Sequence, residues 1–218
     1  SDMSLTIEAV LQRARPVLPV LVLEDASLAV DLAGALQAGG VEVLEVTLRT
    51  ERALEALSAI GKAFPALLVG AGTLIHPEQF AEARDAGARF AVSPGLTARL
   101  AAAAEGAGLP YLPGVMTPSE VLLALECGYR SLKLFPANGN ASIKLLNTLK
   151  GPFTGIRFCP TGGVTAENLL NFLRLPNVAC VGGTWLAPAN LIRARAWDQI
   201  TQLALEAGEL ARSLEHYA

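Results

Sequence analysis

Residues 41–72, VEVLEVTLRTERALEALSAIGKAFPALLVGAG, contain one complete strand–helix–strand unit. Its two ends, Val43–Leu48 and Leu67–Gly72, are short apolar runs with the length of buried strands. Between them, Ala53 and Leu57 recur at the four-residue spacing of one helix face. A helix that joins two apolar strands is the usual connection between parallel strands of one sheet.

The same unit recurs along the whole chain. Thr117-Pro118-Ser119-Glu120 is a capping box with proline at the first helical position, and glycines such as Gly87 follow the helical stretches. Eight runs are predicted to be strands: Val17–Leu23, Val43–Leu48, Leu67–Gly72, Phe90–Ser93, Tyr111–Val115, Ser131–Phe135, Arg157–Pro160 and Ala179–Gly182.

Eight alternating units predict an α/β protein with one domain, a (β/α)₈ TIM barrel over residues 1–218. Ser1-Asp2, ahead of Met3, has the character of a cloning remnant. A doubly wound dinucleotide-binding sheet is the structural alternative, but it would have GxGxxG after the first strand. The first strand instead ends in Val22-Leu23-Glu24-Asp25, which argues against that alternative.

Composition excludes several classes of function. Hydrophobic residues make up 52% of the 218 residues and charged residues 17%, which suits strands buried on both faces. The net charge of -3 and the scattered Lys and Arg residues argue against nucleic-acid binding. No apolar run is long enough for a membrane span, and no secretory signal pattern is visible, so we expect a cytoplasmic protein.

The residues that most often bind metals are scarce. The three cysteines form no CxxC pair, and we interpret them as small buried hydrophobes in a reducing compartment. The chain has two histidines, His76 and His216, so a histidine-rich metal site cannot be built.

Lys133 is the first polar residue at an unusual position. It lies inside the predicted strand Ser131–Phe135 with Leu132 and Leu134 on either side, although lysine is almost never fully buried without a partner. Burial favours the neutral amine, which is a nucleophile for carbonyl carbon. The alternative is a structural ion pair at the barrel mouth, and position alone favours neither.

Glu45 is the second polar residue at an unusual position. Alternation along its strand places Val43, Glu45 and Thr47 on one face. A carboxylate that points into a barrel is costly unless it is paired or functional. Its functional role would be general acid/base catalysis, and its structural role would be to neutralise Lys133 or Arg49; both can hold at once.

Further candidates follow the predicted strands, where (β/α)₈ barrels place their active sites. Arg49 follows the second strand and Thr73 the third; a guanidinium there suits a substrate carboxylate, although alone it is more often a surface group. Thr161-Gly162-Gly163 follows the seventh strand and is expected to enter a helix at Thr165. Gly182-Gly183-Thr184 follows the eighth and is expected to lead into a short segment at Trp185–Asn190. Paired glycines at these two positions predict a phosphate site, whereas a lone pair would indicate only a turn.

Taken together, these motifs resemble the bacterial 2-keto-3-deoxy-6-phosphogluconate (KDPG) and 4-hydroxy-2-oxoglutarate (KHG) aldolases over about residues 16–207. The motifs that carry the resemblance are Glu45-Val46-Thr47-Leu48-Arg49-Thr50, Gly70-Ala71-Gly72-Thr73, Ser93-Pro94-Gly95, Lys133-Leu134-Phe135-Pro136-Ala137 and Phe158-Cys159-Pro160-Thr161-Gly162-Gly163.

The resemblance implies a metal-independent class I aldolase, a lyase, with no cofactor beyond a covalent Schiff base. It implies that Lys133 forms the imine with the substrate ketone and that Glu45 moves protons. It assigns the pyruvate-end carboxylate and the distal phosphate to substrate-binding residues: Arg49, Thr73, Phe135, Thr161, Gly162, Gly163, Gly183 and Thr184. It also implies pyruvate and glyceraldehyde 3-phosphate as products, a homotrimer, and a place in the Entner–Doudoroff pathway. The family often has an acidic residue in the segment after the sixth strand, but residues 138–142 have none.

Several alternatives stay open. The galactonate epimer of the substrate, or 4-hydroxy-2-oxoglutarate, would share the pyruvate-forming half of the reaction. A phosphate-binding barrel synthase, such as a thiamine-phosphate synthase, would explain the glycine loops but not a lysine inside the sixth strand. A non-catalytic phosphosugar-binding barrel would bind ligand without turnover and would leave Lys133 inert.

Overall fold

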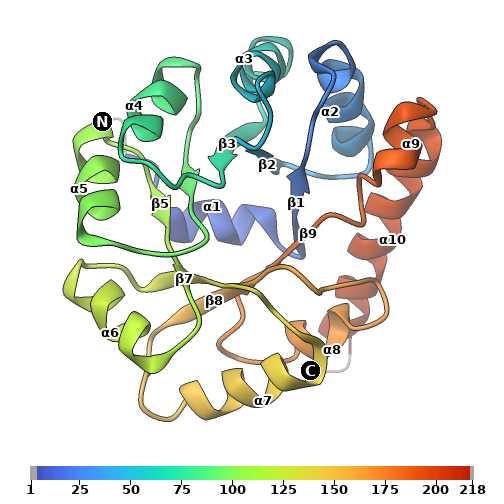
Figure 1. Ribbon diagram of the computed structural model, residues 1–218. Helices are drawn as coiled ribbons and strands as arrows, with labels where there is room; N and C mark the ends of the chain where they lie inside the picture. The colour runs from blue at the N-terminus through green and yellow to red at the C-terminus, as the bar shows by residue number, and fades with distance from the viewer. Residues whose placement is uncertain (1–3, 217–218) are drawn as a thin grey trace.

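The computed structural model describes residues 4–216. The interpretation of Ser1-Asp2 as a cloning remnant falls outside these residues. Figure 1 shows the strands running around a central axis, with most of the helices arranged as an outer ring. Every strand pairing in the described chain is parallel, as the strand–helix–strand pattern predicts.

All eight predicted strand regions contain a strand. The run predicted as Tyr111–Val115 is divided at Pro113, because proline has no N–H to donate to a neighbouring strand. The strands are β1 (Val17–Leu21), β2 (Val43–Thr47), β3 (Leu68–Gly72), β4 (Ala91–Val92), β5 (Tyr111–Leu112), β6 (Gly114–Val115), β7 (Ser131–Leu134), β8 (Arg157–Pro160) and β9 (Val181–Gly183).

The strands form two sheets that curve around one interior. The 6-stranded sheet has the order β5-β4-β3-β2-β1-β9, and the 3-stranded sheet has the order β6-β7-β8. Two isolated bridges, Phe158 to Val178 and Thr161 to Gly182, connect β8 with the segment that leads into and includes β9. The fold is therefore α/β, with parallel sheet curled into a partial barrel.

Helices cover the outside of the sheets and one end of the interior. They are α1 (Ile7–Ala14), the 3-10 helix η1 (Ala26–Leu28), α2 (Ala29–Ala38), α3 (Ala53–Ala63), α4 (Glu78–Asp85), α5 (Ala98–Ala107), α6 (Pro118–Glu126), α7 (Gly139–Leu149), α8 (Leu169–Leu173), α9 (Ala189–Arg193) and α10 (Trp197–Glu215). The predicted capping box is confirmed: Thr117 Oγ1 accepts from Glu120 N, and Glu120 Oε1 accepts from Thr117 N at 2.8 Å.

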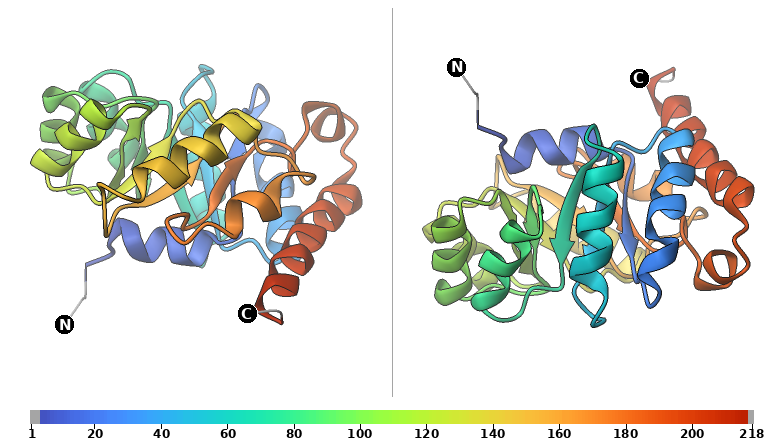
Figure 2. Two further views of the ribbon diagram at one scale, coloured as in Figure 1. Left: turned by 90° about the horizontal axis from the view of Figure 1, so that it is seen from below. Right: turned by 90° about the horizontal axis from the view of Figure 1, so that it is seen from above.

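The hydrophobic core has two layers. The larger layer lies between the strands and the outer helices. The smaller layer fills the interior of the curved sheets and includes Leu18, Val43 and Leu68 from the first halves of their strands. Helix α1, which the sequence pattern did not predict, closes this end, and Figure 2 shows it below the strands in the left-hand view. The side chains late in the strands therefore face the opposite, open end.

One helix prediction is wrong at its boundary. The helix expected from Thr165 begins at Leu169, because the Asn168 side chain holds a turn: its Oδ1 accepts from Thr165 N at 2.8 Å, and its Nδ2 donates to Gly163 O at 3.0 Å. The short segment expected at Trp185–Asn190 is non-helical as far as Pro188, and α9 begins directly after it at Ala189.

Within the described residues, no helix combines the length and the apolar character needed to cross a membrane.

Candidate active site

A cavity of about 380 Å³ opens at the C-terminal end of the strands. Its walls come from β1, β2, β7 and β9 and from the loops that follow β2, β3, β4, β7, β8 and β9. All ten residues proposed from the sequence line it, namely Glu45, Arg49, Thr73, Lys133, Phe135, Thr161, Gly162, Gly163, Gly183 and Thr184. Parallel topology explains this convergence, since it brings the carboxyl ends of all strands to one side.

Lys133 points into the cavity from the middle of β7 and is 5% exposed. Its Nζ lies 4.7 Å from the centre of the Phe135 ring, within the range of a cation–π interaction when the amine is charged. No carboxylate of residues 4–216 lies within 4.0 Å of Nζ. The structural ion pair considered as the alternative for Lys133 is therefore not formed in this structure.

Glu45 lies in the same cavity on β2 and is 1% exposed. Burial raises the pKa of the Glu45 carboxyl above its ordinary value, and the nearby Lys133 charge opposes that rise only in part. Within residues 4–216, its Oε2 atom has no hydrogen-bond partner. A buried carboxyl with a raised pKa and a free oxygen is suited to exchange protons with a bound molecule.

Gly72 makes room for this carboxylate. A Cβ atom at Gly72 would overlap the Glu45 carboxylate, and a Cβ at Gly70 would overlap the Phe90 ring. The Gly70-Ala71-Gly72 segment of β3 therefore has small residues because two large side chains of the interior lie against its backbone.

Arg49 and Thr73 lie at the mouth of the cavity. Arg49 is exposed, in the turn after β2, and within residues 4–216 its side chain forms no ion pair. Thr73 follows β3 and has a φ of 60°, a conformation that is uncommon for a residue with a side chain. Strain of this kind is found where a side chain or N–H is held for a ligand. The pair can bind a carboxylate from the open side of the cavity.

The glycine loops form a further part of the cavity wall. Gly162 and Gly163 have φ of 98° and 152°, and a Cβ at Gly163 would overlap the Ala137 carbonyl. A Cβ at Gly183 would overlap the Trp185 ring. The close packing leaves only glycine at these positions, and the exposed backbone of Gly162 and Gly163 is accessible to an anion.

Sequence reasoning did not assign four further lining residues: Val20, Thr47, Pro94 and Val164. A signal existed for two of them, since Thr47 shares the inward face of β2 with Glu45 and Pro94 lies in the Ser93-Pro94-Gly95 motif. Pro94 is placed by close packing, because a Cβ at Gly114 would overlap its backbone. Residues 4–216 contain no group of three or more His, Cys, Asp and Glu side chains arranged to hold a metal ion.

Comparison with known proteins gives consistent matches. The family model for KDPG and KHG aldolase matches residues 7–203. The KHG/KDPG aldolase of Escherichia coli (strain K12) is 49% identical over 197 residues, which are 90% of this chain and 92% of that protein. The 2-dehydro-3-deoxy-phosphogluconate aldolase of Dickeya dadantii (strain 3937) is 50% identical over 194 residues, 89% of this chain and 91% of that protein.

Solved structures agree with these sequence matches. KDPG aldolase from Legionella pneumophila, with pyruvate captured at low pH as a covalent carbinolamine intermediate, is 45% identical with a TM-score of 0.89, over 93% of this chain and 98% of that one. The KDPG aldolase of Zymomonas mobilis ZM4 with 3-phosphoglycerate is 42% identical with a TM-score of 0.84, over 92% of this chain and 94% of that one. A native KDPGal structure is 28% identical with a TM-score of 0.78, over 91% and 96%.

Proposed function

This chain belongs to the KDPG and KHG aldolase family, and from that membership we propose that it cleaves 2-keto-3-deoxy-6-phosphogluconate to pyruvate and glyceraldehyde 3-phosphate. It is a lyase. The observation that carries the proposal is a buried lysine amine that shares one cavity with a buried carboxylate whose Oε2 accepts no hydrogen bond from the described residues.

The proposed reaction begins at Lys133. Its Nζ attacks the C2 ketone to give a carbinolamine, which loses water to form a protonated imine. The C3–C4 bond then breaks, its electron pair moves into the imine to give an enamine, and the C4 hydroxyl proton passes to Glu45. Glyceraldehyde 3-phosphate leaves, the enamine is protonated at C3, and water releases pyruvate. The carbinolamine captured in the Legionella protein supports this route.

The two ends of the cavity hold the two charged ends of the substrate. Arg49 and Thr73 bind the carboxylate beside the ketone, and the Arg49 fork bonds both of its oxygens. The distal phosphate lies against the backbone and hydroxyls of the loops after β8 and β9, formed by Thr161, Gly162, Gly163, Gly183 and Thr184. The 3-phosphoglycerate in the Zymomonas structure supports a phosphorylated ligand in this family.

Phe135 lines the cavity beside Lys133. Its ring lies under Lys133 Nζ at 4.7 Å and packs against Gly162. It keeps water away from the amine, which favours imine formation.

Substrate preference has two alternatives within the family. The family includes KHG aldolases, and a KDPGal structure shares the fold at 28% identity, against 49–50% for the relatives named above. These identities favour the gluconate epimer. Relative kcat/KM on the gluconate, galactonate and 4-hydroxy-2-oxoglutarate substrates separates the three.

Borohydride trapping tests the proposal. Pyruvate with borohydride should inactivate the protein and add one reduced pyruvyl group per chain, located at Lys133 by peptide mass spectrometry. Lys133→Arg should fold but take up no label, because guanidinium stays protonated. Lys144→Arg, at an exposed lysine of α7, is the matched control and should label normally. Label at another lysine would contradict the assignment. No label at all would favour a phosphate-binding synthase or a non-catalytic phosphosugar-binding barrel.

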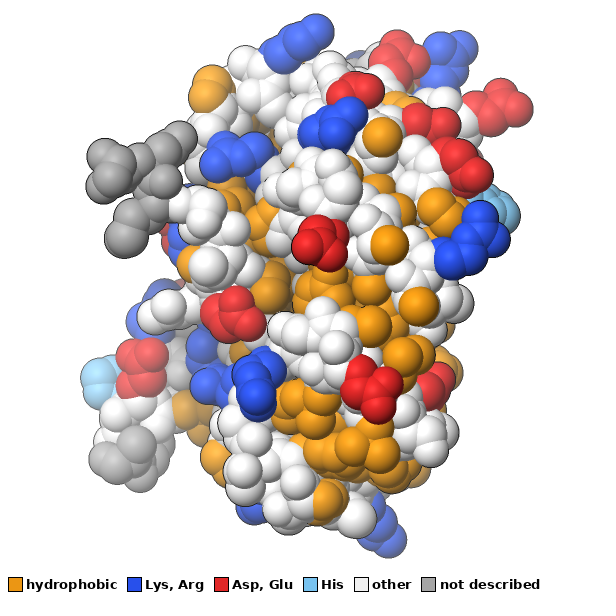
Figure 3. All heavy atoms as spheres, turned by 90° about the vertical axis from the view of Figure 1, so that its left-hand side faces the viewer, with side chains coloured by type: hydrophobic (Ala, Val, Ile, Leu, Met, Phe, Trp, Pro, Cys, Tyr) orange, Lys and Arg blue, Asp and Glu red, His pale blue; other side chains and the backbone are white. Residues whose placement is uncertain are grey.

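At the scale of the whole chain, we propose a single domain that closes into a (β/α)₈ barrel. The bridges between β8 and the segment at β9 and the separation of β5 from β6 by Pro113 alone support closure. We propose that the chain forms a homotrimer. Helix α6 lies on the side of the molecule that faces the viewer in Figure 3, where apolar side chains gather, and its Leu122 is 53% exposed. Sedimentation equilibrium tests this proposal, because it measures the mass of the assembly in solution.

The proposed chemistry needs no cofactor, because the protonated imine itself accepts the electron pair. We place the reaction in the Entner–Doudoroff pathway and in the cytoplasm. The three free cysteines suit the reducing conditions of that compartment.

A further inference from the structure

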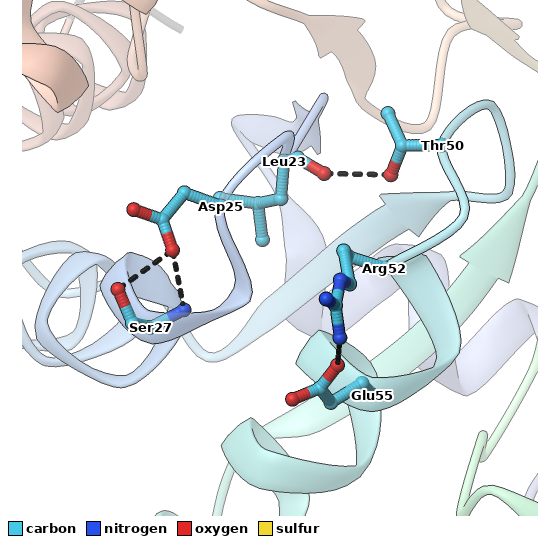
Figure 4. Close-up of polar contacts among 6 residues, drawn as sticks. All are labelled: Leu23, Asp25, Ser27, Thr50, Arg52 and Glu55. Carbon is cyan, nitrogen blue, oxygen red and sulfur yellow. Dashed lines mark hydrogen bonds and ion pairs between the residues drawn. The ribbon is translucent and has the colours of Figure 1, made fainter.

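Two threonines on either side of Arg49 in the sequence donate hydrogen bonds to backbone carbonyls at the end of β1 and just after it. Thr47 Oγ1 donates to the Leu21 carbonyl at 3.0 Å, and Thr50 Oγ1 donates to the Leu23 carbonyl at 2.6 Å. Figure 4 shows the second of these bonds, which joins the loop after β2 to the segment after β1. The turn that carries Arg49 is therefore attached to the neighbouring strand on both sides of the arginine.

The partners of these bonds are themselves fixed. Leu21 and Leu23 are each 1% exposed, so their carbonyls belong to a segment anchored in the core. Beyond Leu23, Asp25 Oδ1 accepts from Ser27 N at 2.9 Å and caps the 3-10 helix, as Figure 4 shows. On the other side of the turn, Leu48 N donates to the Gly72 carbonyl at 2.8 Å.

The ion pair between Arg52 and Glu55, at 2.9 Å, lies in the first turn of α3 and does not involve Arg49 (Figure 4). Arg49 itself is exposed, and within residues 4–216 no side chain is paired with it. Within residues 4–216, no ion pair therefore determines where the guanidinium lies. The position of its backbone must come from the turn.

We propose that Thr50, together with Thr47, is a positioning residue that holds the Arg49 guanidinium over the carboxylate end of the cavity. The inference rests on the proposed function of Arg49 as the carboxylate-binding residue. Thr50 does not line the cavity, so it acts through Arg49 and not on the substrate. A bidentate contact needs both N–H groups in place, and a hydroxyl-to-backbone bond on the adjacent residue limits the turn to one conformation.

This role has a specific kinetic signature. The substrate carboxylate is bound both before and during the reaction, so a misplaced Arg49 weakens ground state and transition state alike. Loss of such uniform binding raises KM and leaves kcat unchanged. A threonine needed only for folding would lower stability without separating KM from kcat.

Thr50→Val tests the proposal, because it keeps the shape of the side chain and removes the donor. KM for the phosphorylated substrate should rise roughly tenfold, with kcat changed by less than about threefold, as a displacement of a positioning group predicts. Thr50→Ser retains the hydroxyl and should restore KM. Thr201→Val is the matched control: Thr201 Oγ1 donates to the Ala35 carbonyl at 2.7 Å between α10 and α2, away from the cavity. It should lower stability and leave KM unchanged.

A double-mutant cycle separates this inference from the proposed function. Arg49→Gln alone should raise KM, and adding Thr50→Val to it should have no further effect, because the group that Thr50 positions is gone. If Arg49→Gln raises KM but Thr50→Val does not, the positioning role is wrong and the role of Arg49 stands. If neither variant raises KM, both are wrong. If Thr50→Val does not fold, Thr50→Ala, which removes the same donor with a smaller side chain, replaces it in the same cycle.

Discussion

The Glu45 carboxylate is buried near an amine without forming an ion pair with it. In the part of the chain that the structure describes, its Oε2 atom has no hydrogen-bond partner, and burial raises the pKa of the carboxyl. Such a group can take a proton from a substrate hydroxyl at neutral pH and return it later in the cycle. Two predictions at the scale of single residues follow from this environment.

The first concerns activity. Glu45→Gln removes the proton acceptor but retains the shape of the side chain, so aldol cleavage should slow by roughly 10²–10⁴-fold. Some borohydride trapping of pyruvate should remain, since Lys133 is intact. Steady-state kcat and the extent of labelling are the two measurements. A variant with near-normal kcat would show that another group transfers the proton.

The second concerns stability and pH. Because the pKa of Glu45 is higher in the folded protein than its ordinary value of 4.5, the folded state binds the proton more tightly than the unfolded state. The free energy of unfolding contributed by Glu45 is therefore fully present below pH 4.5 and is lost as pH rises through the folded pKa. The free energy of unfolding of Glu45→Gln, measured by urea titration, should therefore increase relative to that of the wild type as pH rises. Thr201→Val, which removes a hydrogen bond but no titratable group, should give a flat difference. A flat difference for Glu45→Gln as well would contradict the raised pKa.

At the scale of the element, β3 shapes the site by lacking side chains. Gly72→Ala places a Cβ where the Glu45 carboxylate lies and should displace that carboxylate. Such a displacement of the Glu45 carboxylate should lower kcat about 10²-fold. Gly61→Ala is the control, because a Cβ at this position in α3 meets nothing within 4 Å and alanine favours the helix. It should keep full activity and gain a little stability. Unchanged kcat in Gly72→Ala would mean that the carboxylate has another place to lie.

The loop after β8 yields a second prediction at this scale. Gly163→Ala should disturb the backbone against Ala137 and raise KM for the phosphorylated substrate by roughly tenfold or more, while pyruvate trapping at Lys133 stays close to normal. Gly87→Ala is the control, since Gly87 also has a positive φ of 104° but has open space around it and lies outside the cavity. If Gly163→Ala impairs pyruvate trapping as much as it impairs binding of the phosphorylated substrate, the loop has only a structural role.

At the scale of the whole molecule, the proposed imine chemistry predicts independence from metal ions. Dialysis against EDTA should leave kcat/KM within about twofold, because the electron sink is the protonated imine and not a Lewis acid. The activity of the dialysed protein with and without added divalent cation is the measurement. A loss in EDTA that a divalent cation restores would overturn the class I assignment.

The regions of strand and helix could be predicted from the sequence because their signals are local. Apolar runs, helical spacing and the capping box at Thr117 depend on residues that are neighbours in the chain, and all of them are present in the structure. The family motifs likewise pointed to ten residues that line one cavity. Helix boundaries were less predictable, because the Asn168 side chain keeps residues 163–168 in a turn.

Parallel topology explains why the sequence by itself determined so much of this protein. Once alternation places Glu45 and Lys133 inside a strand and Arg49 and the glycine pairs directly after one, parallel pairing brings them to the same end. The sequence could not determine which contacts those groups make there. The close approach of the Glu45 carboxylate to Gly72 and the attachment of the Arg49 turn to the segment after β1 are contacts between residues far apart in the chain. Only the tertiary structure decides such contacts, because they depend on how neighbouring strands are placed in space and not on the pattern within any one of them.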